Sequence, residues 1–485
     1  MRKAVGRALV LAVLATAPVH AQGATRCIAE NTDTTRQLGI KLPSGQYNFF
    51  WGAGIVVRCP AKQIVLRADS AEQYGDEKRI FLLGHVFYDE PRFSVRSDFL
   101  TYFTADERVV ASGNVHAKMP SGSTLLGPQA TYLRAAPRVR PRAQLTAIGR
   151  PTINIVERDS AGKPMPPMEV IANTVFMDGD SLVYAGGDVQ IHREQFAAQG
   201  DSAFLDGTKE TMRLMRNPKI SGQRGRPFTL VGDLIDMFSQ QRKLRRVLSR
   251  GHAVATSQEM VLNADTIDLR VDNDELERAM AWGPGRAHAK SPTQSLLSDS
   301  IVVEMPHQRV REIHALRKAY AEGKPDTLKF RTGEMDWLRG DTVIAYFDTM
   351  PPRDTTQGIR IRQLVAFDSA RAYYHLPPAD SSCRIAAINY IIGDSIFVNF
   401  DGQRVQNVSA RGHTDGRYAE PDSLCQAAAR ARADSARAHG DSAKARPDTV
   451  KGAVKKPGSG APSSPPAPRK PPTASLYTLA EPRRE

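Results

Sequence analysis

The sequence has only four cysteines, no long apolar run after its first 21 residues, and none of the common catalytic motifs. Without about 20 consecutive apolar residues, no later segment is expected to cross a bilayer as a helix. No CxxC pair stands near a group of histidines, which argues against a zinc site of the usual spacing. HExxH, GxSxG and GxxxxGK[ST] are missing too, so the sequence carries no sign of the enzymes that those motifs mark.

Residues 1–21 have the pattern of a secretory leader. Arg2, Lys3 and Arg7 come first, an apolar run follows over residues 8–17, and Val-His-Ala at residues 19–21 forms a small-x-small cleavage site. We therefore expect an exported protein that is soluble in the periplasm or beyond. Because Cys27 does not stand at the cleavage point, we expect no lipoprotein anchor.

The formal charge of +14 is concentrated at the two ends of the chain. The leader holds three Arg or Lys residues, and the tail over residues 426–485 has twelve basic and five acidic residues. The part between them is therefore close to neutral. A nearly neutral body is a poor surface for tracking phosphates, so no nucleic-acid partner is predicted. We expect the tail, rich in Ala, Arg, Pro, Ser and Lys, to be disordered.

The four cysteines of an exported protein are first interpreted as disulfides. Cys27 and Cys59 flank an N-terminal segment over residues 22–64, and Cys383 and Cys425 flank a C-terminal one. Local pairing, of Cys27 with Cys59 and of Cys383 with Cys425, would stabilise each end of the chain. Three pairings are possible, and the sequence does not choose among them.

One unit recurs along most of the chain: a small residue, then Asp, then apolar residues two and four positions after the Asp. A Gly that opens a second alternating stretch follows in most copies, some 14 to 20 residues later. A repeat of this length cannot bury its apolar face alone, so neighbouring copies are expected to stack. The ten copies align on Asp69, Asp98, Gln129, Asn173, Asp201, Asp233, Asp265, Asp299, Asp341 and Asp394.

Apolar residues two positions apart predict β-strands, because successive side chains of a strand point to opposite faces. The small residue before the Asp indicates a tight corner, where the Asp can bond local backbone. Each unit of about 30 residues then supplies roughly two strands, and the fold is predicted to be all-β. The copies are strong over residues 65–290 and weaker over 291–425.

Several stretches interrupt this pattern. Residues 135–142 and 160–167 are predicted loops, and Ile313–Glu322 is predicted as one short helix. The acidic stretches at residues 178–180 and 272–275 are interpreted as hairpin turns rather than cation sites.

No set of residues with an evident catalytic role stands out in the sequence. Several histidines follow the Gly of a repeat, where alternation places them in strands, and we interpret them as surface residues: His85, His116, His192, His252 and His288. A single Asp per 30 residues or so makes a shared calcium ion difficult to bind. We therefore expect no enzyme activity, no cofactor and no metal site.

What remains is a continuous apolar interior lined by the alternating side chains. It contains small residues such as Ala203 and Ala345 and adaptable ones such as Met177 and Met237. Such an interior is either a filled core or a groove for acyl chains. Periodicity alone does not separate these two possibilities.

The unit, written ADxhxh…hxAxGxVxh, resembles the OstA-like repeats of the LptA family and of the N-terminal part of LptD. The resemblance covers residues 65–412 and is strongest over 65–120 and 170–290. It is carried by Ala68-Asp69, Ser97-Asp98, Ala264-Asp265, Gly84-His85-Val86, Ala111-Ser112-Gly113-Asn114-Val115 and Gly187-Asp188-Val189.

The resemblance implies an open β-jellyroll, a β-solenoid-like stack of two facing antiparallel sheets built from about ten repeats. It also implies a non-enzymatic periplasmic carrier that binds lipopolysaccharide acyl chains in a hydrophobic groove and moves the lipid to the outer membrane. The residues that it places against the acyl chains are Leu100, Tyr102, Val175, Met177, Leu205, Ile235, Met237, Ile267 and Leu269.

The partners that the resemblance implies are inner-membrane Lpt components and an outer-membrane LptD-like protein, joined by edge-to-edge β pairing. Head-to-tail association of this chain with itself is a further expectation, because an open stack leaves unpaired strand edges. The protein would then bridge the inner and outer membranes. The alternative is a structural or adhesive exported β-solenoid with a filled core and no lipid cargo.

Overall fold

The computed structural model describes residues 27–31, 35–136, 139–159, 161–223, 227–258, 260–325, 330–348, 360–377, 384–402, 404–421, 430–431 and 434–435. The predicted leader (1–21), Cys383, Cys425 and nearly all of the predicted tail (426–485) lie outside these residues. The chain divides into two units, Met1–Pro421 and Asp422–Glu485. Every strand below belongs to the first unit, and residues 430–431 and 434–435 of the second are helical.

Within the described residues the first unit has 30 strands and two short 3-10 helices, η1 (Pro60–Lys62) and η2 (Pro306–Gln308). The strands are β1 (Ile28–Asn31), β2 (Arg36–Lys41), β3 (Tyr47–Gly52), β4 (Ile55–Cys59), β5 (Ile64–Ala68), β6 (Ser70–Tyr74), β7 (Arg79–Glu90), β8 (Phe93–Phe103), β9 (Arg108–Lys118), β10 (Thr124–Leu133), β11 (Gln144–Ile148), β12 (Thr152–Ile155), β13 (Met168–Ile171), β14 (Thr174–Asp178), β15 (Leu182–His192), β16 (Phe196–Asp206), β17 (Thr211–Met215), β18 (Lys219–Gly222), β19 (Phe228–Val231), β20 (Leu234–Gln240), β21 (Lys243–Ser257), β22 (Val261–Asp272), β23 (Glu275–Lys290), β24 (Gln294–Glu304), β25 (Glu312–Gly323), β26 (Asp336–Phe347), β27 (Ile361–Leu376), β28 (Ala387–Asp401), β29 (Arg404–Arg411) and β30 (Asp415–Ala419). The predicted all-β jellyroll-like stack is confirmed.

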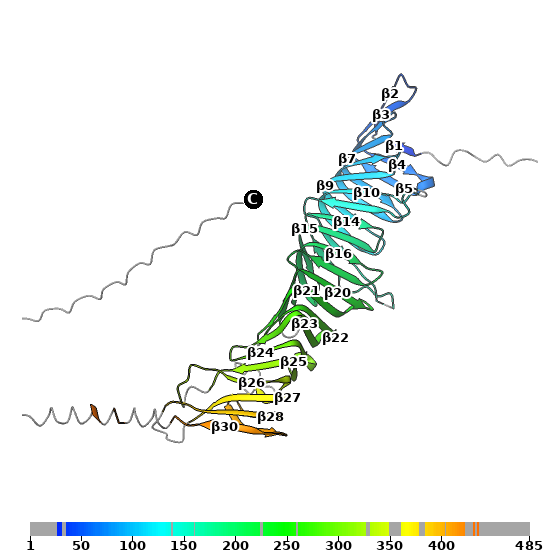
Figure 1. Ribbon diagram of the computed structural model, residues 1–485. Helices are drawn as coiled ribbons and strands as arrows, with labels where there is room; N and C mark the ends of the chain where they lie inside the picture. The colour runs from blue at the N-terminus through cyan, green and yellow to red at the C-terminus, as the bar shows by residue number, and fades with distance from the viewer. Residues whose placement is uncertain are drawn as a thin grey trace, which may run out of the picture. The chain divides into compact units, whose positions relative to one another are not determined.

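Each long strand crosses two facing walls and bends once between them. In β7, residues 79–83 pair with β6, whereas residues 87–89 pair with β5. We call the layer that contains residues 79–83 wall 1 and the layer that contains residues 87–89 wall 2. All pairings between the named strands are antiparallel, and Figure 1 shows the strands following one another along the stack from β2 in blue to β30 in orange.

The walls meet along an edge of repeated corners. The backbone N–H of Asp69 donates to the carbonyl of Gly84 at 3.0 Å, and Asp394 donates to Gly412 at 2.9 Å. Gly84 has a φ of 72°, and a Cβ at this position would overlap the side chain of Asp69. Glycine is therefore needed both for the left-handed backbone and for the close approach of the Asp. A register shift between Leu83 and Val86 turns the strand from one wall into the other.

Three corners are built without glycine. Arg216-Asn217, Arg317-Lys318 and Asp368-Ser369 all have positive φ, between 52° and 63°. Residues other than glycine rarely adopt this backbone conformation. It costs free energy that the paired strands on both sides must offset. The fold therefore continues through rungs whose corner lacks the glycine of the repeat.

The predicted helix over Ile313–Glu322 is wrong, because these residues lie in β25. The corner at Arg317-Lys318 places two left-handed residues in the strand, so that buried Ala315 and Ala319 are four positions apart. That spacing mimics one turn of a helix. The predicted loops lie between β10 and β11 and between β12 and β13, and the stretch at residues 272–275 is the turn between β22 and β23.

A disulfide joins Cys27 to Cys59 at the N-terminal end of the stack. Cys59 ends β4, and β4 pairs with β1, which begins directly after Cys27. The bond thus fastens the first strand of wall 2 to its neighbour. It confirms the local pairing that the sequence left as one of three possibilities for these two cysteines.

The core is one continuous apolar cluster that runs between the walls from Trp51 to Val398. It is lined on both sides by every second residue of the strands, as the period of two predicts. In the described residues the strands pass from one wall to the other at the corners, so the outer ends of the two walls face each other along an opposite edge, which we call the seam.

Candidate functional site

The nine residues predicted to contact acyl chains all point into the apolar cluster between the walls. Their exposed fractions lie between 0 and 6%, for Leu100, Tyr102, Val175, Met177, Leu205, Ile235, Met237, Ile267 and Leu269. Their inward direction follows from the strand period. Their contact with lipid remains a prediction, since protein side chains fill the interior along most of its length.

The seam is bridged near its N-terminal end by a group of ionised side chains, which we call the first clasp: Lys62 and Glu90 from wall 2, and Glu107 and Arg134 from wall 1. Lys62 pairs with Glu107, and Arg134 pairs with Glu90, so each pair crosses the seam. Arg134 also reaches Glu107 at 3.1 Å and the carbonyl of Lys62 at 3.2 Å. The side chain of Glu90 is only 3% exposed. Such a buried carboxylate is stable only because it is paired.

Tyrosines fill the interior behind the first clasp and bond to its carboxylates. Tyr102 donates to Glu107 at 2.8 Å, while Tyr88 donates to Glu90 at 3.1 Å and Tyr132 donates to Glu90 as well. Burial raises the pKa of all three tyrosines above its usual value. They therefore stay neutral donors.

The pKa of Glu107 moves in the other direction. Burial by itself would raise it, but hydrogen bonds from Lys62, Tyr102 and Arg134 outweigh that effect and hold the pKa below its usual value. Glu107 is therefore charged at neutral pH, as its two cationic partners require.

A second clasp crosses the seam farther along the stack: Glu157 and Arg193 from wall 2, and Glu210 and Arg242 from wall 1. Arg242 pairs with Glu157 at 3.1 Å, and Arg193 donates to the carbonyl of Arg242 at 3.0 Å. Arg193 also pairs with Glu157 at 3.3 Å within its own wall. Both clasps thus contain two acidic and two basic side chains, drawn from the turns at the outer ends of the strands.

A cavity of about 320 Å³ lies on the seam between the two clasps. Its floor contains Phe93 and Met119 from wall 2 and Tyr132, Leu145 and Met177 from wall 1. Arg92, Arg142 and Asp180 also line it, so its lining carries charges of both signs.

Beyond the second clasp the seam becomes an apolar cleft, with a cavity of about 80 Å³. Residues of both walls line it: Pro227, Phe228, Ala255, Thr256, Ser257, Gln258, Met260 and Leu262 from wall 2, and Leu269, Leu276, Ala279, Met305, Gln308 and Val310 from wall 1. Beside the cleft, Arg278 pairs with Glu304, and both residues belong to wall 1. Here the two walls face each other mainly through Ala, Leu and Met side chains.

Of the nine predicted residues, Met177 lines the cavity and Leu269 lines the cleft. The other seven lie in the packed interior. The clasp residues were not predicted, because their positions at strand ends do not follow the repeat.

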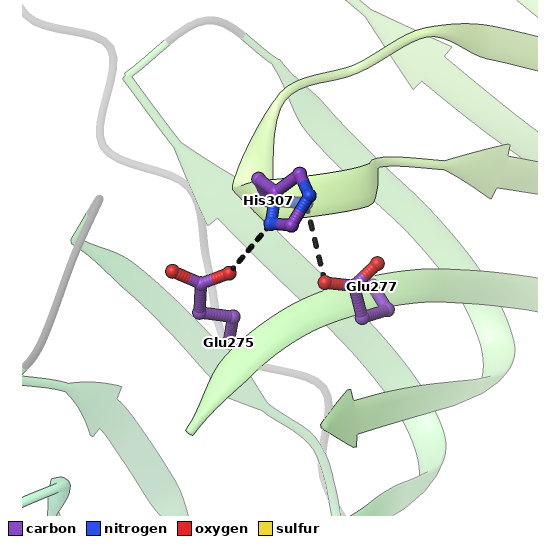
Figure 2. A group of neighbouring side chains, drawn as sticks. All are labelled: Glu275, Glu277 and His307. Atoms are coloured by element: carbon purple, nitrogen blue, oxygen red, sulfur yellow. Dashed lines mark hydrogen bonds and ion pairs between the residues drawn. The ribbon is translucent and has the colours of Figure 1, made fainter. Parts of the chain in front are cut away.

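A small acidic cluster stands beside the cleft on wall 1. Figure 2 shows His307 between Glu275 and Glu277: its Nδ1 lies 3.2 Å from Glu275 Oε2, and its backbone N–H donates to Glu277 at 3.2 Å. The three could supply ligand atoms within 4.8 Å of one another. The hydrogen bonds account for the arrangement, because they hold η2 against the start of β23.

The histidines that follow a corner glycine bond to the corner Asp. His85 Nδ1 lies 2.7 Å from Asp69, and His413 Nδ1 lies 2.9 Å from Asp394. These hydrogen bonds raise the pKa of both imidazoles. In the next rung Asn114 fills the same place and donates to Asp98 at 2.8 Å. The expected bond of the Asp carboxylate to local backbone is thus replaced here by a side-chain partner.

One convergent set was not expected from the sequence. Thr332 Oγ1 lies 3.0 Å from His375 Nε2, and His375 Nδ1 lies 2.7 Å from Asp336. Burial raises the pKa of Asp336, while the hydrogen bonds from His375 oppose the rise. The imidazole is only 2% exposed, and neither cavity described above opens onto it. These hydrogen bonds hold the segment before β26, and the start of β26 itself, against the end of β27.

No family model matches the chain, and a comparison with curated proteins found no match. Among solved structures, the chain is similar to LptH, the LptA homologous periplasmic component of the lipopolysaccharide transport device from Pseudomonas aeruginosa. The sequence identity is 16%, the TM-score is 0.22, and the match covers 33% of this chain and 94% of that chain. Within the described residues, no helix has the length and apolar character that a membrane crossing needs.

Proposed function

We propose that this chain is a non-enzymatic lipid carrier that holds the acyl chains of an amphiphile between its two walls. The observation that carries the proposal is the apolar cleft on the seam, where apolar side chains of both walls line a cavity. Apolar surface removed from water stabilises a bound chain by about 25 cal/mol per Å². Met260 and Met305 can adjust to chains of different shape.

The cleft must widen to accept a chain. Its cavity of about 80 Å³ is well below the roughly 300 Å³ at which ligand pockets begin. Strand pairing runs along each wall and around the corners, so parting the outer ends breaks side-chain contacts but no ladder hydrogen bonds. Wall 1 and wall 2 can therefore separate at this point without unpairing strands, and the cost is the apolar surface that stays exposed until a chain covers it.

The cargo proposed from the repeat resemblance is lipopolysaccharide, carried through the periplasm to the outer membrane. The last strands support partners that add a strand. Within the described residues β29 and β30 pair only with β28, and β30 is exposed throughout. Their outer edges suit β pairing with Lpt components of either membrane, with an LptD-like protein, or with another copy of this chain.

A structural β-solenoid without cargo is the competing function. The observation that favours it is the packed state of seven of the nine predicted residues, including Leu100 and Ile235 at 0% exposure. In that case the cleft would be only an imperfection of the packing.

Photocrosslinking separates the two functions. A photoreactive phenylalanine analogue replaces Leu276, which lines the cleft, or Trp282, which is 38% exposed on the outer face of the same strand β23. Each variant is isolated from the envelope after irradiation and probed for lipopolysaccharide. We expect adducts at position 276 and few at position 282. Equal yields at both positions would favour the structural function.

A further inference from the structure

We infer that the two clasps confine the cargo to the stretch of seam beyond the second clasp, so that acyl chains enter sideways at the apolar cleft and reach the N-terminal rungs only when a clasp opens. This inference rests on the proposed function and specifies the path of the ligand. It assigns a role to eight residues that lie outside the repeat pattern: Lys62, Glu90, Glu107, Arg134, Glu157, Arg193, Glu210 and Arg242.

The first step is that each clasp joins the two walls across the seam. In the first clasp Arg134 of wall 1 meets both Glu90 and the backbone of Lys62 in wall 2. In the second, Arg242 of wall 1 meets Glu157 of wall 2, and Arg193 donates back to the carbonyl of Arg242. An acyl chain that passed along the seam would have to separate these ionised groups and leave them beside hydrocarbon, which costs several kcal/mol for each unpaired charge.

The second step is that the interior behind the first clasp is also blocked. The rings of Phe93 in wall 2 and Tyr132 in wall 1 stack at a centroid distance of 4.0 Å. Tyr88 in wall 2 and Tyr102 in wall 1 approach to 6.2 Å. These aromatic pairs span the space between the walls. The hydroxyl of Tyr88 donates to Glu90, and the hydroxyl of Tyr102 donates to Glu107. A flexible chain cannot displace them without breaking the clasp as well.

The third step is the order of features along the seam. The first clasp is followed by the cavity with Arg92 and Arg142, then by the second clasp, and then by the apolar cleft. The second clasp therefore stands between the cleft and everything N-terminal to it. A chain bound at the cleft can extend away from the second clasp, but extension toward the N-terminus meets Arg242 and Glu157.

The test uses the full chain and a palmitic acid analogue that carries a diazirine in its acyl chain, with labelled peptides located by mass spectrometry. In the wild-type protein we expect labelling on the cleft strands β22 and β23. Labelling of β7–β10 should be lower by about tenfold or more, because a closed seam leaves its open state as a minor population.

Two sets of substitutions remove the side chains that bridge the seam. Glu157→Gln with Arg193→Met and Arg242→Met opens the second clasp and should extend labelling to β14–β17. Adding Lys62→Met, Glu90→Gln, Glu107→Gln and Arg134→Met opens the first clasp as well and should extend labelling to β7–β10. The matched control is Glu30→Gln with Arg58→Met, which removes an ion pair between β1 and β4 within wall 2. The second clasp has no side chain as buried as Glu90, since its most buried member, Arg193, is 10% exposed. Its variant therefore tests the inference even if loss of the first clasp prevents folding.

Wild-type labelling of β7–β10 as strong as that of the cleft would overturn the inference and leave the proposed function intact. Clasp variants that label like the control would also overturn it. Absence of interior labelling in every variant would overturn the proposed function, and the inference with it.

Discussion

The N-terminal rungs β7–β10 and the rungs around the cleft, β19–β24, share one architecture but close it differently. In the N-terminal rungs, tyrosines span the interior and the first clasp seals the seam. Around the cleft, Ala279, Leu276 and Met305 face wall 2 across an opening. Both regions have the same corner, as Gly113 with Asp98 and Gly251 with Asp233 illustrate. The corner therefore determines the two-walled fold, whereas the side chains at the outer strand ends decide whether the walls can part.

The largest expected effect comes from breaking the first clasp. Arg134→Ala leaves Glu90 buried without its cation, which should lower the free energy of unfolding by about 3–5 kcal/mol. Urea denaturation followed by circular dichroism measures the loss. Arg58→Ala, which removes an exposed ion pair with Glu30, should cost about 0–1 kcal/mol. Similar losses in the two variants would show that the clasp does not hold the seam.

The second prediction compares side chains in the two interiors. Leu100→Ala creates a cavity in a packed region and should cost about 2–5 kcal/mol. Leu276 is half-buried and already lines the cleft, so Leu276→Ala should cost clearly less. The same denaturation experiment measures both. Equal costs would mean that the cleft is packed as tightly as the N-terminal interior.

The third prediction tests the feature that the two regions share. A Cβ at Gly113 would lie 2.5 Å from Asp98 Oδ2, at a φ of 75°. Gly113→Ala and Gly251→Ala should therefore destabilise the protein by similar amounts, about 1–3 kcal/mol each. Gly122→Ala is the control, because its φ of 92° is also strained but nothing lies within 4 Å. The additional destabilisation relative to Gly122→Ala measures the effect of the contact with the Asp side chain. Equal destabilisation in all three variants would show that this contact is not the cause.

The smallest expected effect concerns the corner histidines. The pKa of His85 is raised by its hydrogen bond to Asp69, so the stabilising interaction is complete below the unfolded pKa of about 6.5 and is lost as the pH rises through the folded value. His85→Asn should remove this pH dependence while keeping a donor, as Asn114 does in the next rung. Titration of the imidazole by NMR measures the shift. An unshifted His85 would contradict the ion pair.

The strands and most corners are predictable from the sequence because they are local. The period of two gives the inward direction of Leu100 and Ile267, and the small-Asp pair with its later Gly marks the corner between the walls. The prediction fails at Ile313–Glu322, where the charged corner Arg317-Lys318 interrupts the alternation and imitates a helix. The sequence did not predict the set of Thr332, His375 and Asp336, because its members lie up to 43 residues apart in the chain.

Local sequence is enough to predict that amphipathic β-strands stack around an apolar interior, because strand period and corner chemistry depend on residues close in the chain. The places where that interior is sealed follow from the tertiary structure. Arg134 and Lys62 are 72 residues apart, and Arg242 and Glu157 are 85 apart. The stacking of the rungs brings the two residues of each pair together across the seam. No periodic sequence pattern predicts a contact between strand ends that lie so far apart in the chain.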